Sequence, residues 1–262
     1  MIRAKGITLR YGAKTILDRL DFQARPTALT AIVGPNGSGK TTLLKALTGE
    51  TPCTGDVTVA GYDIAVTPAW QLASVRAVLP QSTPMSFPFQ AIEVVRLGLG
   101  QGLSQDARLP YRALARVGLT GYEARFYQEL SGGEQQRVQL ARVLCQVWEP
   151  MVAGQPRWLF LDEPVSSLDI GHQLQVMRIA RDYADAGGGV VAVMHDLNLS
   201  AMFADQVVLM RSGRIVADGR VDLVLTDENL SDAYDCPVRT RRPPPSSDWY
   251  LLPQAAVQPD VA

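Results

Sequence analysis

The chain has 262 residues, enough for one large α/β domain or two small ones with a substantial buried core. Apolar residues make up 47% and charged residues 19%, and the net charge of −1 disfavours non-specific binding to nucleic acid. Apolar runs such as 189–194 are far shorter than the roughly 20 residues that span a bilayer, and the three cysteines form no CxxC pair. We therefore expect a globular protein of a reducing compartment, without a leader peptide or a disulfide framework.

The amino-terminal part of the chain predicts strands around a glycine-rich loop. Residues 2–9 and 55–64 show the alternation and turn residues of short strands, and 28–33 is an apolar strand of the buried type. A helix is expected at about 41–48, directly after the loop. This order of strand, glycine-rich loop and helix is typical of a phosphate-binding site.

Residues 91–150 show helical periodicity and no convincing strand. Strands and helices then alternate, with expected strands at 158–162 and 190–194, a helix at 173–186 and a hairpin of 207–210 with 214–217. Apolar strands alternating with helices predict a largely parallel sheet that is covered on both faces, in an α/β fold. The residues from Arg241 onward, rich in proline, are expected to be extended and loosely held.

The loop after the 28–33 strand matches the phosphate-binding pattern GxxxxGK[ST]. Its residues are Gly34, Pro35, Asn36, Gly37, Ser38, Gly39, Lys40 and Thr41, and we assign the following Thr42 to the same nucleotide site. The glycines let successive backbone N–H groups point at phosphate oxygens, beside the positive end of a helix dipole. Lys40 is expected to reach the β- and γ-phosphates of ATP, and the Thr41 hydroxyl to ligate Mg²⁺. The alternative, a glycine-rich turn without a ligand, is disfavoured by the flanking strand and helix.

Two carboxylates end the apolar strand 158–162. Asp162 is expected beside the P-loop, because the carboxyl ends of parallel strands meet at one edge, and there it would hold Mg²⁺ through the water shell of the ion. Glu163 is placed to polarise the water that attacks the γ-phosphate. An exposed strand end is the structural alternative, and the P-loop earlier in the chain favours the catalytic interpretation.

The segment 130–134, Leu-Ser-Gly-Gly-Glu, resembles the signature sequence of ATP-binding-cassette (ABC) proteins, with Glu134 where the family usually has glutamine. The resemblance extends over roughly residues 1–235. In chain order, Tyr11 resembles the residue that stacks on adenine, Gln81 the Q-loop glutamine, Asp169 the last residue of the D-loop segment Ser167-Leu168-Asp169, and His195 the switch histidine. A tyrosine in an ordinary turn is the alternative for Tyr11, and His172 is interpreted as structural.

The resemblance implies a P-loop NTPase (RecA-like) core with an antiparallel β subdomain and an inserted α-helical signature subdomain. The ABC ATPase domain would comprise residues 1–240, with the helical subdomain at about 82–150, and 241–262 would form a proline-rich tail. The resemblance further implies that Gln81 and His195 contact the γ-phosphate or the attacking water, and that Gln81 also contacts the metal ion.

The signature segment has a physical interpretation of its own. Ser131 precedes a helix expected to run to about Gln146, so a hydroxyl and free N–H groups lie at a positive helix end. A capped surface helix is the alternative. The resemblance implies that Ser131, Gly132 and Gly133 close over the γ-phosphate held by a second copy of the chain, with Asp169 at the same interface. Two copies would then sandwich two ATP molecules.

The resemblance also implies a setting. A single cassette is similar to the ATPases of bacterial importers for iron-siderophores, haem and vitamin B12, and the insertion at 146–157 is similar to that of the haem importers. Such a subunit lies peripherally on the cytoplasmic face of the inner membrane. It works with two integral membrane permease subunits and, indirectly, with a periplasmic substrate-binding protein. Residues 82–89 are interpreted as loop packing or as an apolar patch that contacts the permease.

Two other classes of function remain as alternatives. A soluble cassette ATPase acting on ribosomes or DNA usually carries a second cassette or a long coiled-coil insertion, and neither is present here. A regulatory nucleotide-binding module without hydrolysis is disfavoured by Glu163 and His195. The sequence therefore favours an ATP-hydrolysing subunit that energises haem import, with iron-siderophore or cobalamin import as the alternative.

Overall fold

The computed structural model describes residues 1–81, 85, 87–100, 106–242 and 253. The strands are β1 (Ile2–Tyr11), β2 (Lys14–Ala24), β3 (Leu29–Val33), β4 (Thr54–Val59), β5 (Tyr62–Asp63), β6 (Arg76–Leu79), β7 (Met151–Val152), β8 (Gln155–Pro156), β9 (Trp158–Asp162), β10 (Gly189–Val193), β11 (Gln206–Arg211) and β12 (Arg214–Gly219). The helices are α1 (Lys40–Thr48), α2 (Ala69–Val75), α3 (Ala91–Arg96), α4 (Leu109–Arg116), α5 (Gly132–Gln146), α6 (Ile170–Asp185), α7 (Leu197–Phe203), α8 (Val221–Val224) and α9 (Asp227–Tyr234), with a 3₁₀ turn at Tyr127–Glu129.

The larger sheet has, among the described residues, six strands in the order β12-β11-β3-β10-β9-β6. All neighbouring pairs are parallel except β11 with β12, which form the expected antiparallel hairpin. The prediction of a largely parallel sheet is confirmed. β6 was not predicted, because four residues that include a charged Arg76 carry no strand pattern until they pair with β9.

The smaller sheet, within the same described residues, is antiparallel in the order β2-β1-β4-β5. β2 was not predicted, because its alternation of buried and exposed residues is interrupted. Leu17 and Leu20 are both buried although they are three residues apart, since Arg19 has φ +48° and the pairing with β1 shifts register there.

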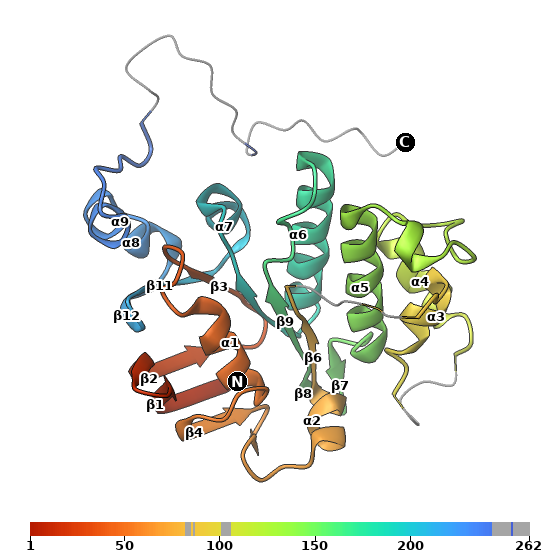
Figure 1. Cartoon of the computed structure of the whole chain (residues 1–262), viewed down its shortest axis with the longest axis horizontal. Helices are drawn as coiled ribbons and strands as arrows, with labels where there is room; N and C mark the ends of the chain where they lie inside the picture. The colour runs from red at the N-terminus through yellow and green to blue at the C-terminus, as the bar shows by residue number, and fades with distance from the viewer. Residues whose placement is uncertain (82–84, 86, 101–105, 243–252, 254–262) are drawn as a thin grey trace.

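The parallel sheet is buried on both faces, as the apolar strands predicted. In β9, Trp158 and Phe160 pack into a core shared with α1 and the antiparallel sheet. Leu159 and Leu161 point the other way, into a core shared with α5 and α6. Figure 1 shows this arrangement, with α1 and the antiparallel strands on one side of β9 and α5 on the other.

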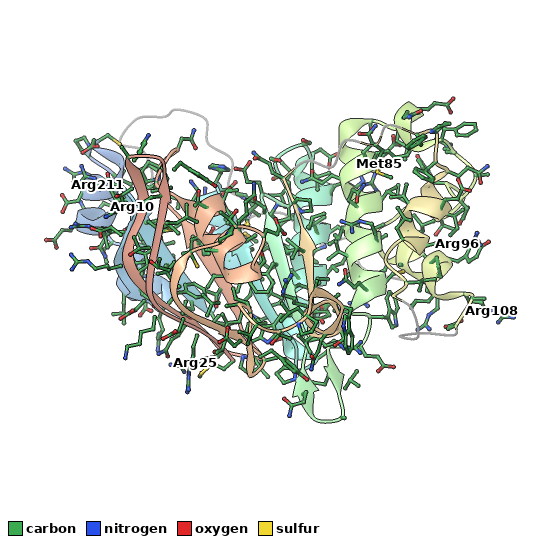
Figure 2. The ribbon with its side chains drawn as sticks, turned by 60° about the horizontal axis from the view of Figure 1, so that its bottom comes forward. Arg10, Arg25, Met85, Arg96, Arg108 and Arg211 are labelled. Carbon is green, nitrogen blue, oxygen red and sulfur yellow. The ribbon has the colours of Figure 1, made fainter. Side chains whose placement is uncertain are left out.

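The helical stretch predicted at 91–150 contains α3, α4 and α5, which pack together at the end of the molecule opposite α8 and α9 (Figure 1). α5 ends at Gln146, where the helix was expected to end. Figure 2 places the side chains of Arg96 and Arg108 on the outer edge of this helical part, while Arg10 and Arg211 project from the opposite end. The signature helix thus belongs to a part of the chain that is separate from the P-loop.

Some expectations fall on residues that the structure does not describe. These are the proline-rich tail at 243–252 and 254–262, and residues 82–84 and 86 of the 82–89 segment. In the part of the chain that is described, no helix combines the length and apolar character needed to cross a bilayer.

Candidate functional site

The P-loop connects the end of β3 to the start of α1. Gly34 has φ +145°, and a Cβ added there would lie 2.1 Å from the carbonyl oxygen of Met210, so no larger residue fits without moving β11. The Lys40 ammonium folds back and donates to the carbonyl oxygens of Gly34 at 2.8 Å and Pro35 at 3.0 Å. The P-loop is therefore closely packed against β11, and its carbonyl groups hold the Lys40 ammonium.

Lys40 is 5% exposed, and burial lowers the pKa of its ammonium, while the negative charges of Glu163 and Asp162 oppose that effect. The Ser38 hydroxyl is also buried and has no hydrogen-bond partner among the residues that the structure describes. A buried ammonium held only by two carbonyl groups and an orphaned buried hydroxyl both fit a triphosphate, whose oxygens accept hydrogen bonds from each.

Asp162 ends β9 and is 2% exposed. Burial raises the pKa of its carboxyl group, and the hydrogen bond from the Thr41 hydroxyl to Oδ1, 3.0 Å long, opposes the rise. A hydroxyl and a carboxylate in contact are hard oxygen ligands of the kind Mg²⁺ accepts, with phosphates and waters completing its shell. Thr41 and Asp162, two of the three residues expected to contact Mg²⁺, therefore fit that ion.

Two of the predicted residues, Gln81 and His195, contact the carboxylate of a third, Glu163. Gln81 Nε2 donates to Glu163 Oε2 at 2.9 Å, and His195 Nε2 lies 2.5 Å from Glu163 Oε1. The cause is topological, because each residue follows the carboxyl end of one of the neighbouring parallel strands β6, β9 and β10. Sequence positions separated by as many as 114 residues thus converge at the edge where the P-loop also lies.

Glu163 has φ +51°, which an L-residue adopts only when its surroundings hold it there. Its backbone N–H donates to the Val193 carbonyl at 3.1 Å, and its carbonyl accepts from Gln136 Nε2 at 2.9 Å. Gln136 was not predicted as a site residue. The sequence offered one signal, its place five residues after Ser131 on the same helix, but only the packing of α5 brings its amide to β9.

α5 begins directly after Ser131, where the sequence predicted a helix start; Ser131 caps it and Glu134 closes a capping box with Ser131. Gly133 lies against the D-loop, since a Cβ added to it would be 3.1 Å from the Ser167 carbonyl oxygen. The start of α5 and the start of α1 lie in different parts of the chain, with β9 and β6 between them in Figures 1 and 2. The structure thus leaves the two helix ends that were predicted to bind phosphate apart.

The remaining predicted residues lie outside the central cluster. Tyr11 ends β1 at the turn to β2 and is 56% exposed, so its ring is open to a flat ligand. Asp169 caps α6, which therefore begins a turn earlier than expected. It accepts hydrogen bonds from the backbone N–H and the ring Nδ1 of His172, both at 2.9 Å, which hold the pKa of Asp169 below its usual range. His172 thus has the structural partner that its interpretation implied.

Known proteins resemble this chain in sequence along nearly its whole length. Hemin import ATP-binding protein HmuV of Jannaschia sp. (strain CCS1) is 60% identical over 98% of this chain and 95% of its own. The protein of the same name from Rhizobium meliloti (strain 1021) is 56% identical over 98% of this chain and 99% of its own.

Solved structures resemble it in fold. An ATP-binding subunit of an ABC transporter superposes with a TM-score of 0.76 at 24% identity, over 86% of this chain and 91% of its own. A dimeric ATP-binding cassette in a post-hydrolysis state, bound to ADP and Pi, gives 0.72 at 22% identity, over 84% of this chain and 99% of its own. Residues 17–166 match the ABC transporter family itself. With the P-loop, the Gln81–Glu163–His195 cluster and these likenesses together, the chain belongs to the ABC transporter family.

Proposed function

We propose that this chain is the ATP-hydrolysing subunit of a hemin importer, bound peripherally at the cytoplasmic face of the inner membrane. The observation that carries the hydrolytic role is the Glu163 carboxylate, held between Gln81 and His195 beside the P-loop. The hemin assignment rests on the relatives, which are hemin import ATP-binding proteins at 51–60% identity over nearly the whole chain.

In this proposal the triphosphate lies over the P-loop and Lys40 leaves the loop carbonyls for the β- and γ-phosphates. Thr41 and Asp162 hold Mg²⁺, which would neutralise phosphate charge when bound. Glu163 orients the attacking water and takes a proton from it, and the adjacent His195 stabilises the γ-phosphate as charge develops. Burial of Lys40 and Asp162 strengthens these interactions, because the local dielectric constant is low.

The active site is proposed to be completed by a second copy. Ser131, Gly132 and Gly133 lie at the exposed start of α5, away from the P-loop of their own chain, so they are free to cover a nucleotide held by a partner chain. Ser167 and Leu168 of the D-loop lie beside the same helix start, so the D-loop with its Asp169 would share that interface. Two chains would thereby form two ATP sites related by two-fold symmetry.

Two permease subunits are proposed to dock on the helical part of the cassette. Exposed apolar side chains gather there on segments that adjoin one another: Phe87 is 68% exposed, Leu97 59% and Phe126 41%. An antiparallel β-bridge pairs Phe126 with Gln90, so the segment of Phe126 lies beside the segment that follows Phe87. Apolar side chains of this size in one region are typical of a contact surface.

The hydrolytic role is tested by Glu163→Gln. This change removes the charge that orients and deprotonates water while keeping the shape of the side chain, so turnover should fall by about 10²-fold or more. ATP affinity, measured by calorimetry, should stay within a few fold of the unchanged protein. Turnover near the original rate would refute the role of Glu163.

The choice of cargo is tested with the cassette purified from membranes together with its permease subunits. Reconstituted in vesicles, the complex should transport hemin in an ATP-dependent manner when its binding protein is supplied. Ferric siderophore and cobalamin should not be transported under the same conditions. Transport of either in place of hemin would favour the alternative importers.

A further inference from the structure

Glu134 occupies both hydrogen-bond donors of Ser131. One oxygen of its carboxylate, Oε2, accepts from the Ser131 backbone N–H at 2.8 Å and from the Ser131 hydroxyl at 2.8 Å. The Glu134 N–H in turn donates to the Ser131 oxygen at 3.3 Å. A capping box ordinarily needs only the bond from the Ser131 N–H to the Glu134 carboxylate and the bond from the Glu134 N–H to Ser131. The bond donated by the Ser131 hydroxyl is additional.

The same donors are the ones that the proposed function needs. If Ser131 is to bind the γ-phosphate of ATP held by a second chain, its hydroxyl must donate to a phosphate oxygen. In this structure the hydroxyl already donates to the Glu134 carboxylate, and the two hydrogen bonds from Ser131 lower the pKa of Glu134 so that it stays ionised. An incoming phosphate therefore meets a like charge and an occupied donor.

The Glu134 carboxylate has polar neighbours other than Ser131. Tyr122 and Arg137 also favour the ionised form of Glu134 and lower its pKa, and the guanidinium of Arg125 lies 3.9 Å from the centre of the Tyr122 ring. Glu134 can therefore release Ser131 without losing every polar partner. The arrangement allows two states, one with Ser131 held by Glu134 and one with Ser131 free for phosphate.

We propose that Glu134 is a positioning residue that competes with the γ-phosphate for Ser131 and so weakens the ATP-driven closure of the two chains. This inference rests on the proposed shared site. It assigns to Glu134 a role in setting how tightly ATP joins the two copies, distinct from its role as part of a helix cap.

The test is Glu134→Gln, made in a chain that also carries Glu163→Gln so that ATP is not consumed. The glutamine amide oxygen still accepts from the Ser131 backbone N–H, so the cap remains, while loss of the charge removes the repulsion of phosphate and weakens the hold on the Ser131 hydroxyl. Because an exposed like-charge contact is weakly unfavourable and a dimer contains two, the dimer dissociation constant in ATP should fall roughly 2- to 30-fold. Sedimentation equilibrium measures it, and the difference should shrink at high salt.

Two matched variants accompany it. Glu134→Asp keeps the charge and should not tighten the dimer, and Glu149→Gln makes the same change of net charge beyond the far end of α5, where no effect is expected. Equal dissociation constants with and without Glu134→Gln, or equal tightening by Glu134→Asp, would overturn the competition. Failure of the Glu163→Gln chain to dimerise in ATP at all would instead refute the shared site of the proposed function.

Discussion

Asp162 is a buried carboxylate whose ionisation costs stability in the nucleotide-free protein. Burial raises its pKa in the folded chain above the value in the unfolded chain. The folded state therefore holds the proton more tightly, and stability falls as pH rises from the unfolded pKa to the folded one. Above that window the cost is constant, because the carboxyl group is ionised in both states. The cost arises because a carboxylate proposed to hold Mg²⁺ is buried away from water.

Asp162→Asn removes this cost and should raise the melting temperature of the nucleotide-free protein at pH 7.5 by roughly 2–4 °C. The gain should shrink as the pH falls and disappear near the unfolded-state pKa of an aspartate, about 4, because the cost of ionising Asp162 arises only above it. Thermal unfolding followed by circular dichroism across this pH range is the measurement. Asp232→Asn, at an exposed site on α9, serves as the control and should change nothing. A lower melting temperature for Asp162→Asn at pH 7.5 would show that the ionised form stabilises the site.

The signature helix α5 is held by close contact with the segment after α3. Gly98 lies there against the backbone of α5, and a Cβ added to it would be 2.0 Å from the Arg142 carbonyl oxygen. Apolar side chains of α3 and α5, Val94 and Val143 among them, share the core beneath this contact. The position of Ser131 therefore depends on how closely these two elements approach.

Gly98→Ala should push α5 away and destabilise the protein by about 1–3 kcal/mol, because a backbone oxygen cannot rotate out of the way as a side chain can. Urea unfolding gives the free energy. Gly171→Ala in α6 is the matched control: the nearest atom to its added Cβ is an Asp169 oxygen at 3.6 Å, an ordinary contact, and alanine favours helix. Equal stability of the Gly98→Ala and unchanged proteins would contradict the close packing.

The whole molecule keeps the two helix ends that are proposed to bind phosphate apart, one at α1 and one at α5, on either side of β9 (Figure 1). A single chain with this geometry offers half of each proposed site. Hydrolysis should therefore depend on protein concentration, and defects placed in different halves should complement each other.

Lys40→Ala and Ser131→Ala damage different halves of the proposed site. Each variant alone should be nearly inactive, because every site in its dimer lacks one part. In an equal mixture, half of the dimers are mixed and each has one intact site, so about a quarter of the original activity should return. Steady-state phosphate release measures it. Activity in the mixture that equals the average of the separate variants would argue against the shared site.

The sequence by itself determined the local features of this protein. The P-loop, the apolar strands β3, β9 and β10, and the helix start after Ser131 depend on patterns that neighbouring residues carry, so they could be predicted without the fold. The strands β2 and β6 could not, because a bulge at Arg19 and a four-residue length hide their patterns until partner strands are present.

Only the tertiary structure decided which side chains meet. The order β10-β9-β6 brings His195, Glu163 and Gln81 to one carboxylate, and the packing of α5 carries Gln136 to the Glu163 carbonyl. These contacts depend on strand order and helix packing, which spacing along the chain does not encode. The same is true of the hydrogen bond that the Ser131 hydroxyl donates to Glu134. A capping-box pattern indicates the cap but not which Ser131 donors the Glu134 carboxylate occupies.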